Sequence, residues 1–115
     1  MKQFVPVIPT HPGHVIRQHV LQALGLSAAE LARSLRFNKV ALHYVLHGRT
    51  GISPALAVRL ACFSNISAED WLNLQQRYDM ALAQLKSAEK LAKIVPYGGR
   101  PLRLKNTMAK SMDGL

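Results

Sequence analysis

SAAELARSLRFNKVALHYVLHG, residues 27–48, is the stretch that decides the fold. Ser27 is placed to cap a helix, and Glu30, three residues further on, completes a capping box with it. Apolar residues then recur at helical spacing on both sides of a short break: Leu31, Ala32 and Leu35 before it, and Leu42, Val45 and Leu46 after it. Gly48 tolerates the left-handed conformation that commonly ends a helix. The pattern predicts two short helices joined by a tight turn at residues 36–38.

Two short helices with so small a gap have the spacing of a helix-turn-helix, whose second helix enters the DNA major groove. Ala32 is small at the position where the second helix must approach the first closely. A capped pair of apolar stripes also occurs in other small helical bundles. The short gap, Ala32 and the basic surroundings together favour DNA binding.

Composition points to the same kind of partner. The chain has 115 residues, 49% of them hydrophobic, which is enough for one domain with a modest core. Its 15 Lys and Arg exceed its 6 Asp and Glu, so the formal net charge is +9. Such an excess favours a polyanion, because each neutralised phosphate releases counterions on binding. The alternative is a merely soluble basic protein.

The single cysteine, Cys62, excludes an internal disulfide framework and fits a cytoplasmic location. It lies in the apolar run 57–63, which predicts a buried thiol. Pro6 and Pro9 interrupt the first apolar stretch, so we expect no signal peptide. No run approaches the roughly 18 apolar residues of a membrane span, and we expect no membrane association.

Three further helices complete the prediction of an all-α, five-helix domain. The first opens at HPG, residues 11–13, with proline in the first turn. The fourth opens at Ser53 and Pro54, and the fifth at Ser67. Their predicted inward faces are Ile16, Val20, Leu21 and Leu24 on the first helix, Leu56, Ala57, Leu60 and Ala61 on the fourth, and Trp71, Leu74, Tyr78, Leu82 and Leu85 on the fifth.

We divide the chain into an N-terminal arm (1–10), a helix-turn-helix domain (11–83) and a basic C-terminal extension (84–115). The arm is expected to be extended. The fifth helix is predicted to run from residue 68 to about residue 93, so that its second half projects from the domain or packs against another subunit. The extension carries seven basic residues against two acidic ones. It either lies along DNA phosphates or forms a solvated end.

The DNA-facing surface follows from helical geometry, because the side opposite the apolar face of the second helix must point outward. The predicted DNA-contacting residues are Asn38, Lys39, Val40, His43, Tyr44, His47, Arg49 and Thr50, the last two through the DNA backbone. Lys39 suits a phosphate or a guanine edge, and Val40 suits a thymine methyl group. His43 and Tyr44 can donate hydrogen bonds to bases or phosphates. An alternative for Tyr44 is that it folds back onto the domain.

A catalytic function finds little support. The chain has six carboxylates, no Gly-rich phosphate loop and no nucleophile elbow, so we expect neither an enzyme nor a cofactor. His43 and His47 lie one helical turn apart and could share a metal ion, but no carboxylate or thiol is close in sequence to complete the site. We therefore interpret them as two polar groups on an exposed face and expect no bound metal.

Six short motifs lie along residues 11–80. They are HPG (11–13), LGLS (24–27), AELA (29–32), GIS (51–53), AVRLA (57–61) and WLNLQ (71–75). With these motifs the chain resembles the HigA-type antitoxins of the lambda-repressor-like helix-turn-helix class. HPG and WLNLQ are more specific to that family than the helix-turn-helix itself.

The resemblance implies a homodimer that binds its own operator on double-stranded DNA and represses it. Two recognition helices would then dock in successive major grooves about 34 Å apart. The resemblance also implies a partner, a small ribosome-dependent mRNA endonuclease toxin that the antitoxin neutralises by direct binding. Two alternatives remain: a stand-alone transcription regulator of the same fold, and a protein-interaction module with weak DNA binding.

The chain departs from the family pattern in three places. Arg36 stands where the family usually has glycine, and a non-glycine residue in the left-handed conformation costs about 1 kcal/mol. The second helix of the motif has few of the Ser, Thr and Arg residues that are usual there. The tail beyond about residue 83 is longer than in many relatives.

Overall fold

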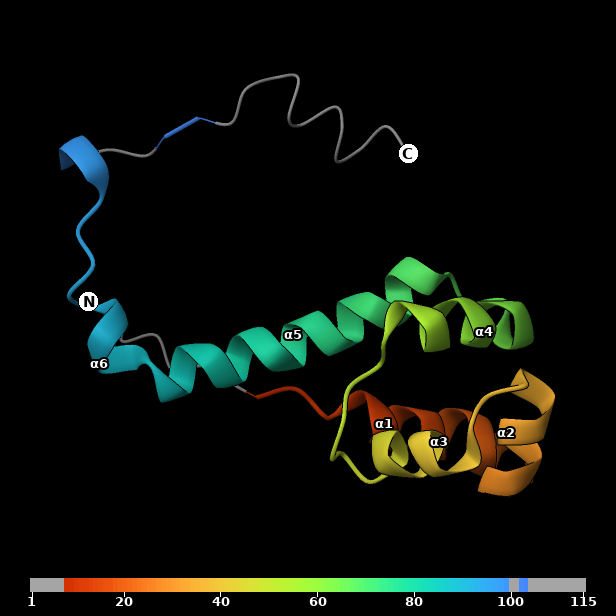
Figure 1. The fold of residues 1–115 in the computed structure, drawn as a ribbon. Helices are drawn as coiled ribbons and strands as arrows, with labels where there is room; N and C mark the ends of the chain where they lie inside the picture. The colour runs from red at the N-terminus through yellow and green to blue at the C-terminus, as the bar shows by residue number, and fades with distance from the viewer. Residues whose placement is uncertain (1–7, 100–101, 104–115) are drawn as a thin grey trace.

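The computed structural model describes residues 8–99 and 102–103. In order, its elements are α1 (Pro12–Ile16), the π-helical η1 (Arg17–Gln22), α2 (Ala28–Leu35), α3 (Lys39–Leu46), α4 (Pro54–Ser64), α5 (Ala68–Lys86), α6 (Ala88–Leu91) and the short 3₁₀ turn η2 (Tyr97–Gly99). Figure 1 shows α1 to α4 grouped around the first part of α5, whose second part reaches away from them. The predicted all-α class is therefore confirmed. Residues 1–7 of the arm, and residues 100–101 and 104–115 of the C-terminal extension, lie outside the described residues.

Side-chain caps begin the helices where the sequence predicted them. In the capping box of α2, the Glu30 N–H donates to Ser27 Oγ at 3.1 Å, and the Ser27 N–H donates to Glu30 Oε1 at 2.9 Å. Ser53 Oγ accepts from the Leu56 N–H at the start of α4, and Ser67 Oγ accepts from the Asp70 N–H at the start of α5. Each cap satisfies a backbone donor that the first helical turn leaves without a partner.

The turn of the helix-turn-helix depends on one residue in the left-handed conformation. Arg36 follows α2 with φ 51° and ψ 44°. The guanidinium of Arg59, on α4, donates from Nη1 to the carbonyl oxygens of Leu35 and Arg36, each at 3.0 Å. These charge-assisted hydrogen bonds offset the cost of about 1 kcal/mol that a non-glycine residue carries here. Arg36 can therefore occupy this left-handed position without being glycine.

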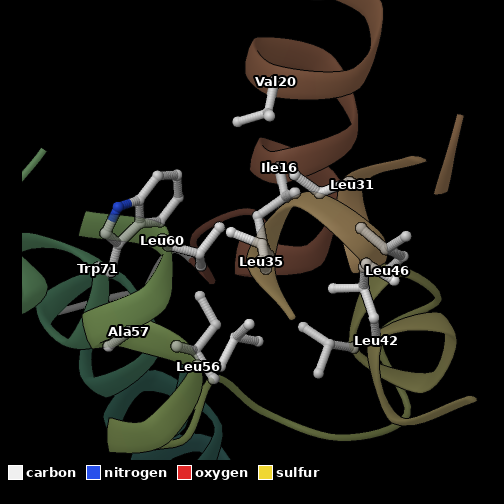
Figure 2. Close-up of a cluster of buried hydrophobic side chains, with 13 residues drawn as sticks. Ile16, Val20, Leu31, Leu35, Leu42, Leu46, Leu56, Ala57, Leu60 and Trp71 are labelled. Atoms are coloured by element: carbon white, nitrogen blue, oxygen red, sulfur yellow. The ribbon is translucent and has the colours of Figure 1, made fainter. Parts of the chain in front are cut away.

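All the inward-facing residues predicted for the helix-turn-helix are buried. They belong to one cluster (Figure 2) made of Ile16, Val20, Leu31, Ala32, Leu35, Leu42, Val45, Leu46, Ile52, Leu56, Ala57, Leu60 and Trp71. Trp71 is anchored as well as buried, since its Nε1–H donates to Ser64 Oγ at 3.2 Å. The Ser64 hydroxyl in turn donates to the Leu60 carbonyl oxygen at 2.6 Å. Trp71 thus joins α5 to α4 through packing and a polar link.

Three residues predicted to face inward are exposed: Leu24, Cys62 and Leu85, the last with 51% of its surface exposed near the end of α5. Leu24 has 59% of its surface exposed, because the π-helical segment η1 changes the helical register after Ile16. Cys62 is also exposed. It lies two residues after the buried Leu60, about 200° further around α4, and so points away from the core.

The fifth helix ends earlier than predicted. It breaks at Ser87, whose φ of −110° and ψ of 14° end α5 at Lys86, and α6 begins at the next residue. The last buried residue of α5 is Ala81, and α6 has none. Because most helical stability in proteins comes from packing, a segment without it does not sustain one long helix. Within the described ranges, no helix combines the length and the apolar character needed to cross a membrane.

Candidate nucleic-acid interface

The outer face of α3 brings most of the predicted DNA-contacting residues together. Three apolar residues of α3 are buried, and all eight predicted contact residues are exposed. Five of the eight line one shallow surface depression: Lys39, Val40, His43, Tyr44 and Arg49. Asn38 and His47 flank this group as the N-cap and C-cap of α3, and Thr50 follows Arg49 in the next loop.

Asn38 and Tyr44 each make a local contact. The Asn38 Oδ1 accepts a hydrogen bond from the Ala41 N–H at 2.9 Å, so this oxygen is engaged in capping α3. Tyr44 remains 41% exposed, with its ring edge-on to His43 and the ring centroids 6.3 Å apart. Tyr44 therefore stays on the outer face and does not fold back into the core.

The rings of His43 and His47 lie close together, with centroids 4.2 Å apart. Partial desolvation lowers the pKa of His47, and the nearby positive groups of His43, Arg17 and Arg49 lower it further. In the described part of the chain, no third His, Cys, Asp or Glu joins the pair to form a metal-binding group. The pair is thus part of a basic surface.

Helix α1 lies against the end of α3, and this contact depends on Gly13. A Cβ atom at Gly13 would lie 1.9 Å from the Val45 carbonyl oxygen, far inside any real contact. One helical turn after Gly13, Arg17 comes close enough to His47 to affect its pKa. Arg17 Nη2 also donates to His14 Nδ1 at 3.1 Å. The sequence alone does not place Arg17 and His14 beside α3, because they reach it only through the tertiary contact at Gly13.

The loop between α3 and α4 is tied to α5 by a buried glutamine. Gln75 is 8% exposed, and its Oε1 accepts a hydrogen bond from the Ile52 N–H at 2.8 Å. Its Nε2 donates to Asp79 Oδ1 at 3.0 Å. A Cβ atom at Gly51 would lie 2.7 Å from Gln75 Cδ, so glycine allows the loop to approach the amide. The motifs GIS and WLNLQ therefore meet at this contact.

His11 supports the same loop from the other side. Its Nδ1 accepts a hydrogen bond from the Gly13 N–H at 2.9 Å, and its ring packs edge-on against Tyr78 at a centroid distance of 4.8 Å. Burial lowers the pKa of His11, while the charge of Asp79 and a backbone hydrogen bond at Thr50 act in the opposite direction. The motif HPG thus helps to fix the loop that carries Arg49 and Thr50.

Comparisons with known proteins match this architecture. No family model matches the chain. Virulence-associated protein I of Dichelobacter nodosus is 34% identical over 83 residues, which cover 72% of this chain and 75% of the relative. A solved addiction module antidote protein of the HigA family from Coxiella burnetii is 34% identical, with a TM-score of 0.74 over 79% of this chain and all of that one. The Pseudomonas aeruginosa antitoxin HigA, solved with the higBA promoter, is 32% identical with a TM-score of 0.73, over 76% of this chain and 97% of that one.

The fold and the exposed face of α3 define a helix-turn-helix protein of the transcription-regulator class. Within that class, the chain belongs to the HigA family of antitoxins. This is a family of regulators and not of enzymes. The family inferred from HPG and WLNLQ is confirmed, and both motifs contribute contacts to the loop that carries Arg49 and Thr50, two of the predicted DNA-contacting residues.

Proposed function

We propose that this protein is a repressor that binds the operator of its own operon through α3, and that it acts as the antitoxin of a toxin–antitoxin pair in the cytoplasm. The observation that carries the proposal is the exposed basic face of α3, where Lys39, His43 and Arg49 share one depression. The similarity of this chain to a HigA antitoxin solved with promoter DNA supports the same proposal.

The residues on this face are suited to different parts of a DNA duplex. Lys39 and Val40 stand in the first turn of α3, the part of a recognition helix that reaches base edges. We propose that Lys39 contacts a guanine edge or a phosphate, and that Val40 contacts a thymine methyl group. His43 and Tyr44 then donate hydrogen bonds to bases or phosphates. Arg49 and Thr50, beyond the end of α3, contact the DNA backbone and fix the register.

We also propose that the protein binds as a homodimer on a palindromic site. The second part of α5 and the segment after it carry large apolar side chains with little to cover them: Met80 and Leu85 are 53% and 51% exposed, and Leu91 is 45% exposed. A second copy would cover such residues, and its recognition helix would enter the next major groove about 34 Å away. Sedimentation of the purified protein at micromolar concentration distinguishes dimer from monomer.

Footprinting on the DNA upstream of the protein's own gene tests the repressor. A protected palindrome whose affinity falls steeply with salt is the expected result. Weak binding that is indifferent to sequence would instead favour a protein-interaction module of the same fold.

The antitoxin role has a separate test, because a stand-alone regulator of this fold would repress without a toxin. The neighbouring small open reading frame is expressed alone and then together with this protein. We expect growth arrest in the first case and rescue in the second. A harmless neighbour would favour the stand-alone regulator.

A further inference from the structure

Arg17 lies at the junction of α1 and η1, where α1 meets the end of α3. The absence of a side chain at Gly13 allows this approach, since a Cβ atom there would collide with the Val45 carbonyl oxygen. His47 lies two residues after Val45, and Arg17 lies one helical turn after Gly13. The packing that buries Gly13 thus places a guanidinium beside the C-cap of the recognition helix.

The guanidinium is held in place but is not neutralised by its described contacts. Its Nη2 donates to His14 Nδ1 at 3.1 Å, which leaves the ring proton of a neutral His14 on Nε2. Its Nε is buried and has no hydrogen-bond partner among the residues that the structure describes. A buried donor without an acceptor is unfavourable, so the described residues do not supply the guanidinium with all the acceptors it can use.

The surroundings of Arg17 are basic on three segments of the chain. His14 stands on α1, His43 and His47 stand on α3, and Arg49 stands in the following loop. The charged neighbours that affect His47 are all positive. Like charges repel each other, so this surface is suited to a polyanion and unsuited to a metal cation.

We propose that Arg17, positioned by His14, is a phosphate-binding residue that extends the DNA interface from α3 onto α1. The inference rests on the proposed DNA-binding function and adds to it a backbone contact outside the helix-turn-helix. Phosphate oxygens accept from the guanidinium, whose charge and fork geometry suit them. Such a contact adds affinity for any duplex and carries no sequence information of its own.

The test measures binding to the duplex upstream of the protein's gene and to a shuffled duplex of equal length, across salt concentrations. Arg17→Met and Arg17→Gln keep much of the stem and remove the charge. We expect either variant to bind both duplexes about tenfold more weakly at moderate salt. The slope of log affinity against log salt should fall by about one per protomer. Arg17→Lys should retain most of the slope.

Arg77→Met is the matched control, because Arg77 lines a different surface depression on α5 together with Val15. Val15 is two residues before Arg17 and so faces the other side of the helix. Melting temperatures of all variants show whether each one folds. If a folded Arg17→Met or Arg17→Gln has the affinity and salt slope of Arg77→Met, the proposal is wrong.

The role of His14 has its own readout, in which His14→Ala is combined with Arg17→Met. If His14 acts by positioning Arg17, its replacement weakens binding in the wild type and has no further effect in the Arg17 variant. Equal effects in both backgrounds would contradict the positioning role. A wild-type protein that does not prefer its upstream duplex would count against the repressor, while the slope on the shuffled duplex would still test Arg17.

Discussion

Gln75 and Ile52 are joined by a buried hydrogen bond of 2.8 Å from the Ile52 N–H to the Gln75 side-chain oxygen. The two residues are 23 positions apart in sequence, and the bond ties the loop that follows α3 to α5. Arg49 and Thr50 belong to that loop and are exposed. Gln75, a residue of the motif WLNLQ, thus helps to fix the loop that carries Arg49 and Thr50 without lying on the proposed DNA-contacting surface itself.

Replacing Gln75 by Ala should lower the free energy of unfolding by about 2 kcal/mol, because it leaves a buried N–H without an acceptor. Urea denaturation followed by circular dichroism measures the change. Gln76→Ala is the control, since Gln76 is the exposed neighbour on the same helix and should change stability by less than about 0.5 kcal/mol. Equal stabilities of the two variants would show that the Ile52 bond contributes little.

A second prediction concerns the contact between α1 and α3. Gly13→Ala should destabilise the fold by about 3 kcal/mol, because the added methyl group would meet the Val45 carbonyl and backbone cannot move aside cheaply. Gly25→Ala is the comparison. Gly25 has a φ of +67° and open space around it, so only the left-handed conformation is penalised, by about 1 kcal/mol. If Gly25→Ala proves the more damaging of the two, the close approach at Gly13 is not what the fold requires.

Local signals in the sequence were sufficient for most of the fold. Ser27 with Glu30, and Ser53 and Ser67, form their hydrogen bonds within three residues, so the starts of α2, α4 and α5 were readable from sequence. The outer face of α3 followed from its apolar periodicity. Neither kind of signal needs knowledge of which helices touch.

Most of the errors and omissions depend on register or on tertiary contact; the exception is Cys62, whose exposure follows from its helical spacing from Leu60 within the apolar run. The burial of Leu24 was predicted wrongly, because no feature of the sequence indicated the π-helical segment that precedes it. The predicted long fifth helix was wrong because its second half lacks buried neighbours. Gln75 and Arg17 were not recognised because their roles depend on segments distant in sequence. Periodicity can show which face is buried but cannot show what that face meets.

A third prediction is that fold stability depends on the protonation of His11. Burial lowers the pKa of this imidazole, so the folded state favours the neutral ring whose Nδ1 accepts from the Gly13 N–H. The unfolded chain takes up the proton first, near pH 6.5. The stabilisation is therefore complete above that pH and is lost as the pH falls through the lowered pKa of the folded state.

Urea denaturation between pH 7.5 and pH 5 measures this loss. His11→Asn keeps an N-cap acceptor without a titratable ring, so its stability should vary less with pH than that of the wild type. His19→Asn, which changes an exposed histidine of η1, controls for the number of histidines and should behave as the wild type does. A His11→Asn protein with the wild-type pH dependence would exclude His11 as the source.

A fourth prediction addresses the face of α3. Lys39→Ala and His43→Ala should each weaken binding to the upstream duplex by about tenfold and leave the melting temperature unchanged, because both side chains are exposed. Electrophoretic mobility shifts at fixed salt measure the affinities. Arg77→Ala, on α5, is a control of equal charge, because Arg77 lines a surface depression separate from the one on α3. Unchanged binding by both α3 variants would mean that DNA docks on another face.

The last prediction concerns pH and DNA affinity. In the free protein the pKa of His47 is lowered by partial desolvation and by the positive groups of His43, Arg17 and Arg49. A phosphate placed beside His47 acts in the opposite direction and raises its pKa. Binding then takes up a proton, so affinity should increase as the pH falls from 7.5 toward 6.

His47→Gln isolates this contribution, because the other titrating groups remain and only the imidazole is lost. Fluorescence anisotropy with a labelled upstream duplex at constant ionic strength measures affinity at each pH. We expect a shallower pH dependence for His47→Gln than for the wild type, with the two proteins closest at pH 7.5, where His47 is neutral. Parallel curves for the two proteins would show that no phosphate lies beside His47, and would place the DNA backbone away from the surface that His47 shares with Arg17.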